Sequence, residues 1–165
     1  MKHYNSHVLK LLSLPQRTIT CNLCTSKDCY IKRTKRYFFK VKEDNNTMAK
    51  ITLIVEDDTS IGEVLVYAIS QATSYTALTV SDGFEALEII KGVKPDLFIL
   101  DYQLPRMTGI ELYDRLHSLQ GLEHIPTIIM SANLPESAIR QRHLIGIRKP
   151  FELDELLDTI EKLIA

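Results

Sequence analysis

Residues 48–165 predict an α/β fold in which helices cover both faces of a parallel sheet. Five short apolar runs, rich in β-branched residues, alternate with five stretches of helical periodicity. The runs are apolar throughout, which is typical of strands buried on both faces. Two of the runs end directly in acidic residues, and open α/β sheets bind their ligands at the carboxyl ends of the strands.

The predicted strands recur at regular intervals along this part of the chain. We expect them at about 51–55, 75–80, 96–100, 126–130 and 144–148. The first run is followed at once by Glu56, Asp57 and Asp58, and the third is followed by Asp101. Strict alternation of strands with helices favours parallel neighbours.

A predicted helix follows each strand. The first begins after Asp58, the second after Asp82 and the third near Thr108, because these residue types favour helix N-caps. The fourth covers about 135–142 and is short. The positions expected to face the core are Ile61, Val64, Leu65, Ala68 and Ile69 in the first helix, Phe84, Leu87 and Ile90 in the second, Leu112, Leu116 and Leu119 in the third, and Leu153, Leu156, Leu157, Ile160, Leu163 and Ile164 in the last.

Acidic side chains at neighbouring strand ends predict a metal site. Glu56 and Asp57 after the first strand, and Asp101 after the third, would crowd into one crevice. Several anions cannot share a small volume without a cation between them. Carboxylate oxygens suit a hard divalent ion, most simply Mg2+.

The first 47 residues differ in composition from the rest. They hold ten Lys or Arg against three Asp or Glu, a net charge of +7, whereas residues 48–165 hold ten against eighteen, a net charge of −8. All three cysteines, Cys21, Cys24 and Cys29, lie in this extension. An odd number of cysteines argues against a secreted disulfide scaffold. No apolar run approaches the ~20 residues that cross a bilayer, so we expect a cytoplasmic protein without membrane contact.

Residues 1–47 leave several interpretations open. The favoured one is a basic, cysteine-containing extension that is disordered, or that is not translated, since Met48 stands just before the first strand as a natural start would. A zinc site is less favoured, because the cysteines lack a fourth ligand downstream. The basic run at 32–36 lies beside aromatic residues and could contact nucleic acid, but a solvated tail is the simpler interpretation.

Four sequence blocks together resemble the receiver domain of two-component response regulators. They are Ile54-Val-Glu-Asp-Asp58, Pro95-Asp-Leu-Phe-Ile-Leu-Asp-Tyr-Gln-Leu-Pro-Arg-Met-Thr-Gly109, Ile129-Met-Ser-Ala132 and Arg148-Lys-Pro-Phe151. They occur in the family's order and span most of residues 50–165. The resemblance implies a flavodoxin-like, doubly wound (βα)5 fold with a five-stranded parallel sheet in the order 2-1-3-4-5.

The resemblance also assigns roles to residues at the strand ends. Asp101 is implied as the phosphoacceptor, a carboxylate nucleophile that forms an acyl phosphate. Glu56, Asp57, Asp101 and the backbone carbonyl of Gln103 are implied as the protein's ligands to Mg2+. The metal would neutralise charge on the incoming phosphoryl group.

Two residues on the outer strands complete the implied site. Lys149 is implied to pair with Asp101 and then with a phosphoryl oxygen, and Ser131 to donate its hydroxyl to another oxygen. The peptide bond before Pro150 is expected in the family's cis form. The remaining acidic and histidine side chains are interpreted differently: Asp58, Asp82 and Asp96 as caps or loop residues, and His117, His124 and His143 as surface residues.

Two features depart from the family's pattern. Receivers usually carry an aromatic residue on the fifth strand, three positions before the lysine, and here that position is Gly146. The stretch from Ser131 to Lys149 is also about four residues shorter than the resemblance implies, close to one helical turn. We expect a truncated fourth helix and an altered surface around it, with the phosphorylation chemistry untouched.

These observations predict a single-domain response regulator, residues 48–165. A sensor histidine kinase or phosphotransfer protein would phosphorylate Asp101 with Mg2+, and a downstream protein would read the result, with homodimerisation as a further option. Because the sequence ends with the last helix, we expect no output domain, and no enzymatic activity beyond self-phosphorylation and autodephosphorylation. The alternative is a phosphorylation-independent pseudo-receiver that acts as a binding module, which Gly146 and the short helix favour. A magnesium-dependent phosphatase is disfavoured, because Gln103 stands where such enzymes carry an aspartate.

Overall fold

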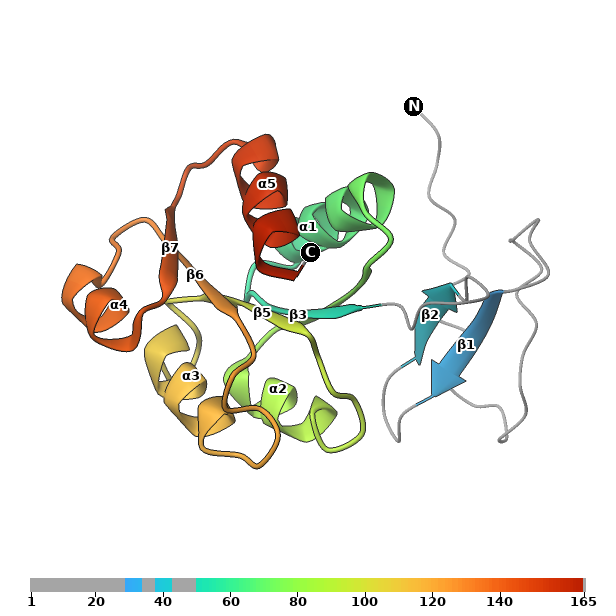
Figure 1. Cartoon of the computed structure of the whole chain (residues 1–165), viewed down its shortest axis with the longest axis horizontal. Helices are drawn as coiled ribbons and strands as arrows, with labels where there is room; N and C mark the ends of the chain where they lie inside the picture. Colours follow the sequence, from blue (N-terminus) through green and yellow to red (C-terminus); the bar gives the residue numbers. More distant parts are fainter. Residues whose placement is uncertain (1–28, 34–37, 43–49, 165) are drawn as a thin grey trace.

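The five-stranded parallel sheet that the sequence predicts is present. The computed structural model describes residues 29–33, 38–42 and 50–164 (Figure 1). The sheet consists of β3 (Ile51–Val55), β4 (Thr76–Val80), β5 (Leu97–Asp101), β6 (Thr127–Ser131) and β7 (Ile145–Arg148). Neighbouring strands are parallel, in the order β4-β3-β5-β6-β7. Counted from β3, this confirms the order 2-1-3-4-5.

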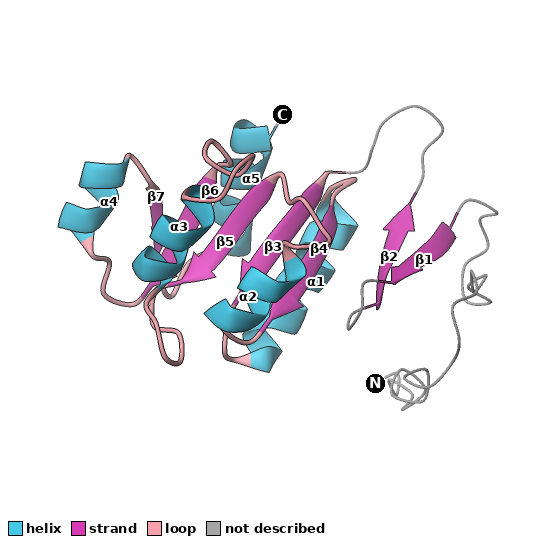
Figure 2. Ribbon diagram, turned by 90° about the horizontal axis from the view of Figure 1, so that it is seen from below, coloured by secondary structure: helices cyan, strands magenta, loops and turns pink. Residues whose placement is uncertain are grey.

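Five helices accompany the sheet. They are α1 (Thr59–Ala72), α2 (Gly83–Ile89), α3 (Gly109–His117), α4 (Glu136–Arg142) and α5 (Leu153–Ile164). The helices α1 and α5 cover one face, α2 and α3 cover the other, and α4 lies at the β7 edge (Figures 1 and 2). The two faces of the sheet therefore bury two separate hydrophobic cores.

Alternation along the central strands fills both cores. In β5, Phe98 and Leu100 belong to the core under α2 and α3, while Leu97 and Ile99 belong to the core under α1 and α5. All five residues of β5 are buried. A strand that is buried on both faces has no polar side, which explains the apolar run at residues 97–100.

Side-chain caps determine where the first three helices begin. Asp58 accepts hydrogen bonds from the N–H groups of the first turn of α1, and Asp82 does the same for α2. Thr108 and Glu111 form a reciprocal capping box at α3. All three predicted helix starts are confirmed. The short fourth helix, α4, has no side-chain cap.

Two strands run one residue further than predicted. Asp101 and Ser131 are the last residues of β5 and β6 rather than the first residues of the following loops. The ladder continues past Asp101 because Tyr102 donates its N–H to the carbonyl of Met130, at 2.8 Å. Sheet hydrogen bonds therefore hold the backbone of both residues.

Four predicted core positions are exposed: Val64, Phe84, Leu119 and Leu153. The buried residues of α2 are Gly83, Ala86 and Ile89. The buried face of α2 is thus rotated from the one we expected, and the guanidinium carbons of Arg106 and Arg115 lie 4.5 and 5.8 Å from the centre of the exposed Phe84 ring. Leu119 lies beyond the end of α3, where helical periodicity no longer applies.

The N-terminal extension contains a described pair of antiparallel strands, β1 (Cys29–Arg33) and β2 (Phe38–Lys42). Cys21 and Cys24 lie outside the described residues, as do positions 34–36 of the basic run. The expectations about disorder, translation, zinc and nucleic acid for residues 1–47 stay predictions. Among the residues the structure does describe, no helix has the length and apolarity needed to cross a membrane.

Candidate metal centre

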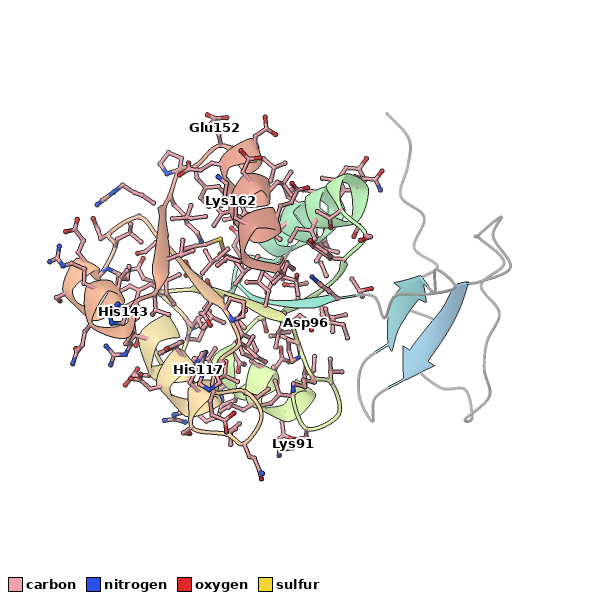
Figure 3. The ribbon with its side chains drawn as sticks, viewed as in Figure 1. Lys91, Asp96, His117, His143, Glu152 and Lys162 are labelled. Atoms are coloured by element: carbon pink, nitrogen blue, oxygen red, sulfur yellow. The ribbon has the colours of Figure 1, made fainter. Side chains whose placement is uncertain are left out.

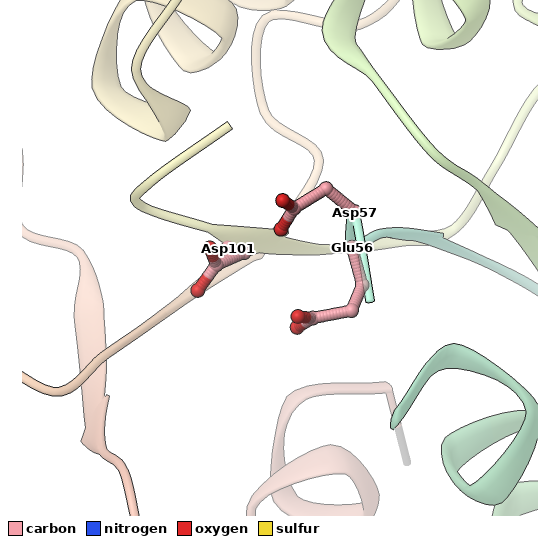
Figure 4. A group of neighbouring side chains, drawn as sticks. All are labelled: Glu56, Asp57 and Asp101. Atoms are coloured by element: carbon pink, nitrogen blue, oxygen red, sulfur yellow. The ribbon is translucent and has the colours of Figure 1, made fainter. Parts of the chain in front are cut away.

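Three carboxylates meet at the carboxyl ends of the two central strands. Glu56 and Asp57 follow β3, and Asp101 ends β5. One oxygen from each carboxylate lies within 4.8 Å of the others. Figure 4 shows the three side chains directed into a shared space. The structure thus brings together the three acidic side chains that the sequence placed in one crevice.

The parallel register of β3 and β5 produces this arrangement. Val55 pairs with Leu100, so the residues that follow, Glu56 and Asp101, lie side by side at the carboxyl ends of the two strands. The N–H of Glu56 donates to the carbonyl of Val80 at 3.0 Å, which ties it to β4 as well. Glu56 and Asp101 are buried, whereas Asp57 is exposed. The site therefore has a closed inner side and an open outer side.

A single ammonium group bridges the two buried carboxylates. Nζ of Lys149 lies 2.7 Å from Oε2 of Glu56 and 2.9 Å from Oδ1 of Asp101. Lys149 follows β7, and its N–H donates to the carbonyl of Ser131 at 2.9 Å. The peptide bond between Lys149 and Pro150 is cis, as expected. The contact between Lys149 and Glu56 was not predicted, although a buried carboxylate next to Asp101 signals the need for a cationic partner.

Burial and ion pairing shift the pKa values of Glu56 and Lys149 in opposite directions. Burial raises the pKa of Glu56, against the lowering effect of its hydrogen bond from Lys149. Burial lowers the pKa of Lys149, but its hydrogen bonds to Glu56 and Asp101 outweigh this, and the net shift is upward. Lys149 therefore stays protonated at neutral pH and supplies a fixed positive charge at the site.

Asp101 is oriented by the loop that follows it. Its Oδ2 accepts the N–H of Gln103 at 3.1 Å, which leaves Oδ1 to Lys149. Gly109 packs against the same backbone, where a Cβ would lie 2.3 Å from the Asp101 carbonyl oxygen. Only glycine fits at that distance. Gln103 itself is exposed, and its N–H is the group that the structure shows bound to Asp101.

Ser131 stands beside the site but is engaged with its own loop. It ends β6, and Met130 before it pairs with Asp101. Its hydroxyl donates to the carbonyl of Asn133 at 3.0 Å and accepts the N–H of Asn133 at 3.1 Å. These two bonds close a turn directly after the strand.

The other acidic residues that follow strands or precede them have structural partners. Asp58 and Asp82 are helix caps, as described above. Asp96 accepts the N–H of Ile51 at 2.7 Å, at the amino ends of the strands. All three are the cap and loop residues that the sequence predicted.

The prediction for the histidines is wrong at one position. His124 and His143 are exposed, whereas His117 is half-buried at the end of α3 (Figure 3). Its Nδ1 lies 2.9 Å from the carbonyl oxygen of Glu123, and its Nε2 lies 3.2 Å from the hydroxyl of Thr127. Burial lowers the pKa of His117. The loop after α3 folds back over this ring, which helical periodicity alone does not reveal.

The donor set fits a hard divalent cation. Carboxylate oxygens are the ligands that Mg2+ takes in proteins, and Glu56, Asp57 and Asp101 would hold it. The two buried carboxylates already attract one cation, the ammonium of Lys149. Among the described residues no salt bridge to Asp57 is present, so this carboxylate on the open side of the site remains available as a ligand.

The chain is similar to known proteins of two-component signalling. Residues 52–161 match the family model of the response regulator receiver domain. Sporulation initiation phosphotransferase F of Bacillus subtilis is 32% identical over 116 residues, which cover 68% of this chain and 91% of that protein. Hybrid signal transduction histidine kinase D of Dictyostelium discoideum is 28% identical over 137 residues, but the match spans only 9% of that kinase.

A solved structure extends the likeness to the fold. The chemotaxis response regulator CheY4 of Vibrio cholerae aligns with a TM-score of 0.65 and 26% identity, over 70% of this chain and 99% of its own. The aligned part has the length of the sheet and its helices. The likeness therefore supports the strand order described above.

Proposed function

The chain belongs to the response regulator receiver domain family, and from this premise we propose that it accepts a phosphoryl group on Asp101. The observation that carries the proposal is the set of three carboxylates within 4.8 Å, two of them bridged by Lys149. Such a set combines a nucleophile, a place for a divalent cation and a fixed positive charge. The transfer of a phosphoryl group needs all three.

The proposed reaction is a displacement at phosphorus. An oxygen of the Asp101 carboxylate attacks the phosphorus of a phosphohistidine, the P–N bond breaks, and its electron pair leaves with the imidazole of the donor. The product on this chain is an aspartyl phosphate, which water later hydrolyses to the carboxylate and inorganic phosphate. Lys149, already 2.9 Å from Asp101 Oδ1, pairs with the added phosphoryl oxygens. Ser131 donates its hydroxyl to another of them.

Glu56, Asp57, Asp101 and the backbone carbonyl of Gln103 are the proposed ligands of Mg2+. When bound, the ion offsets the charge of the incoming phosphoryl group and orients it toward Asp101. The burial of Glu56 and the exposure of Asp57 suit a site that admits both ion and phosphoryl group from one open side.

The proposed partners are a histidine kinase or phosphotransfer protein as donor and a downstream protein as reader. Support comes from relatives that are named as a phosphotransferase and as a hybrid histidine kinase. On this proposal, the domain catalyses only its own phosphorylation and dephosphorylation. A second copy of the chain is an alternative reader.

The test is phosphorylation by acetyl phosphate in the presence of Mg2+, followed on a phosphate-affinity gel. Wild type should acquire one phosphoryl group that alkali and hydroxylamine release, as expected of an acyl phosphate, and Asp101→Asn should acquire none. Asp58→Asn is the matched control, because Asp58 adjoins the site as a helix cap and asparagine caps equally well. Equal labelling of Asp101→Asn and wild type would refute the proposal.

A binding module that works without phosphorylation is the second candidate. The observation that favours it is Gly146, in the place where the family's pattern has an aromatic ring, together with the seven-residue α4. Beryllium fluoride separates the candidates, because it mimics an aspartyl phosphate only where Asp101 and Mg2+ form a working site. If beryllium fluoride binds saturably and only with Mg2+, the result favours phosphorylation of Asp101 over the binding module.

A further inference from the structure

The side chains of Leu134, just before α4, and Ile139, within α4, rest directly on the backbone of Gly146. A Cβ at this position would lie 2.8 Å from Cδ1 of Ile139 and 3.2 and 3.4 Å from the two δ carbons of Leu134. The first distance is shorter than packed carbon atoms tolerate. Leu134 and Ile139 therefore occupy the volume beside β7 that a side chain at position 146 would need.

Few other contacts hold α4 in place. None of its seven residues is buried, and it has no side-chain cap. Its shortest polar contact with another element is a fork in which Arg142 donates to both carboxylate oxygens of Asp114 on α3, at 2.7 and 2.8 Å. Within α4, Ala138 and Ile139 are the partly buried hydrophobic residues that pack against the core. The position of α4 thus depends strongly on the contact with Gly146.

The same contact lies one residue beyond the turn that Ser131 closes. The Ser131 hydroxyl binds both the N–H and the carbonyl of Asn133, and Leu134 follows next. A hydroxyl that turns to a phosphoryl oxygen on Asp101 gives up its bond to the Asn133 carbonyl. The segment that ends in Leu134 is then held at the strand end by one hydrogen bond fewer.

We propose that Leu134, seated on Gly146, carries the state of Asp101 to α4 and β7. This inference rests on the proposed function. Because Gly146 has no side chain, Leu134 and Ile139 can shift across the strand without having to move past one. The outward result is a rearrangement of the exposed contacts of Glu136, which lies 3.6 Å from Arg140 and 3.7 Å from Arg148.

The test uses 15N-labelled full chain with Mg2+, titrated with beryllium fluoride and followed by NMR. In wild type we expect amide shifts at 101–103, at 131–134 and across 136–148. In Leu134→Ala the shifts at 101–103 should persist, while those across 136–142 fall by about half or more, because the coupling contact is gone. An unchanged response of α4 in Leu134→Ala would overturn the inference.

Leu157→Ala is the matched control, since Leu157 is a partly buried leucine that packs against the opposite core. It should leave the α4 response intact. If wild type shows no shift at 101–103, the proposed function fails and the inference fails with it, whereas shifts confined to 101–103 and 131–134 overturn the inference alone.

Gly146→Ala perturbs the same contact from the strand side. The atom in its way, Cδ1 of Ile139, is the free end of a flexible side chain, so the variant should fold. We expect α4 amides to shift without beryllium fluoride, and Ile139→Ala added to Gly146→Ala should return them toward their resting positions. Resting positions that do not change in Gly146→Ala would contradict the proposed seat. A thermal unfolding curve shows whether the variant folds, and if it does not, the Leu134→Ala experiment alone decides.

Discussion

The centre and the edge of this sheet are built in different ways. Every residue of β5 is buried, and so are residues 52–55 of β3. At the edge, β7 has one buried residue, Ile147, and α4 has none. The acidic site lies at the ends of the central strands, where packing on both faces fixes the backbone. The departures from the family's pattern lie at the edge, where packing is thin.

This contrast separates two requirements of a molecular switch. Attack at phosphorus needs atoms held in place to within a fraction of an ångström, which the centre provides. A readable change needs an element with few attachments, which the edge provides. Four predictions test the contrast, from the largest expected effect to the smallest.

Truncation of a central side chain should destabilise the fold far more than truncation at the edge. Phe98 is 0% exposed in β5, and Phe98→Ala should lower the free energy of unfolding by about 3–5 kcal/mol. Ile139→Ala in α4 removes a half-buried side chain and should lower it by only about 1 kcal/mol. Urea denaturation measures both. Equal losses would remove the distinction between centre and edge.

Removal of the central ammonium should alter stability and metal binding in opposite directions. Lys149→Met leaves Glu56 and Asp101 without their shared cation, so the metal-free protein should lose about 1–3 kcal/mol of stability. Mg2+ should bind about tenfold more tightly, because a positive charge that opposes it is gone. Calorimetric titration measures this affinity, with Lys162→Met as control, because Lys162 is an exposed residue of α5. Weaker Mg2+ binding in Lys149→Met would contradict the charge argument.

Acidification should weaken the centre through His117, whose ring lies 6.3 Å from that of Phe98. Burial lowers the pKa of His117, so as the pH falls below about 6.5 the unfolded chain binds a proton that the folded one does not. Stability conferred by the neutral ring is complete above that pH and declines below it. Two nearby charged groups also act on the pKa of His117: His124 lowers it and Asp114 raises it. In His117→Gln the fall in stability between about pH 7.5 and about pH 5.5 should be smaller than in wild type. Identical pH dependence in both proteins would count against this account.

The smallest effect is expected at the fork between α4 and α3. Arg142 and Asp114 are both partly exposed, so Arg142→Gln should cost less than about 1 kcal/mol of global stability. Its main result should be faster amide hydrogen exchange within α4. Arg140→Gln, whose ion pair with Glu136 is longer at 3.6 Å, serves as control. If exchange in α4 is the same in both variants, the fork does not hold the helix.

Strand positions and the acidic cluster could be predicted from the sequence because both depend on local patterns. A β-branched apolar run is buried wherever it lies in a parallel sheet, and Glu56, Asp57 and Asp101 follow such runs directly. Parallel register then brings these residues together without further information.

Contacts that depend on tertiary approach could not be predicted. The exposure of Phe84 depends on which face α2 turns to the sheet. The burial of His117 depends on a loop that returns over its ring. The filling of the space at Gly146 by Leu134 and Ile139 likewise depends on how α4 docks. The bridge from Lys149 to Glu56 joins residues 93 positions apart.

The bridge has a consequence for how the resting protein responds to its surroundings. Its ammonium and two carboxylates are mostly shielded from solvent, so dissolved monovalent ions screen them little. Fluctuations in potassium or sodium should leave the resting site unchanged. A small ion of higher charge is attracted more strongly to these carboxylates, so the site should respond to divalent ions far more than to ordinary salt.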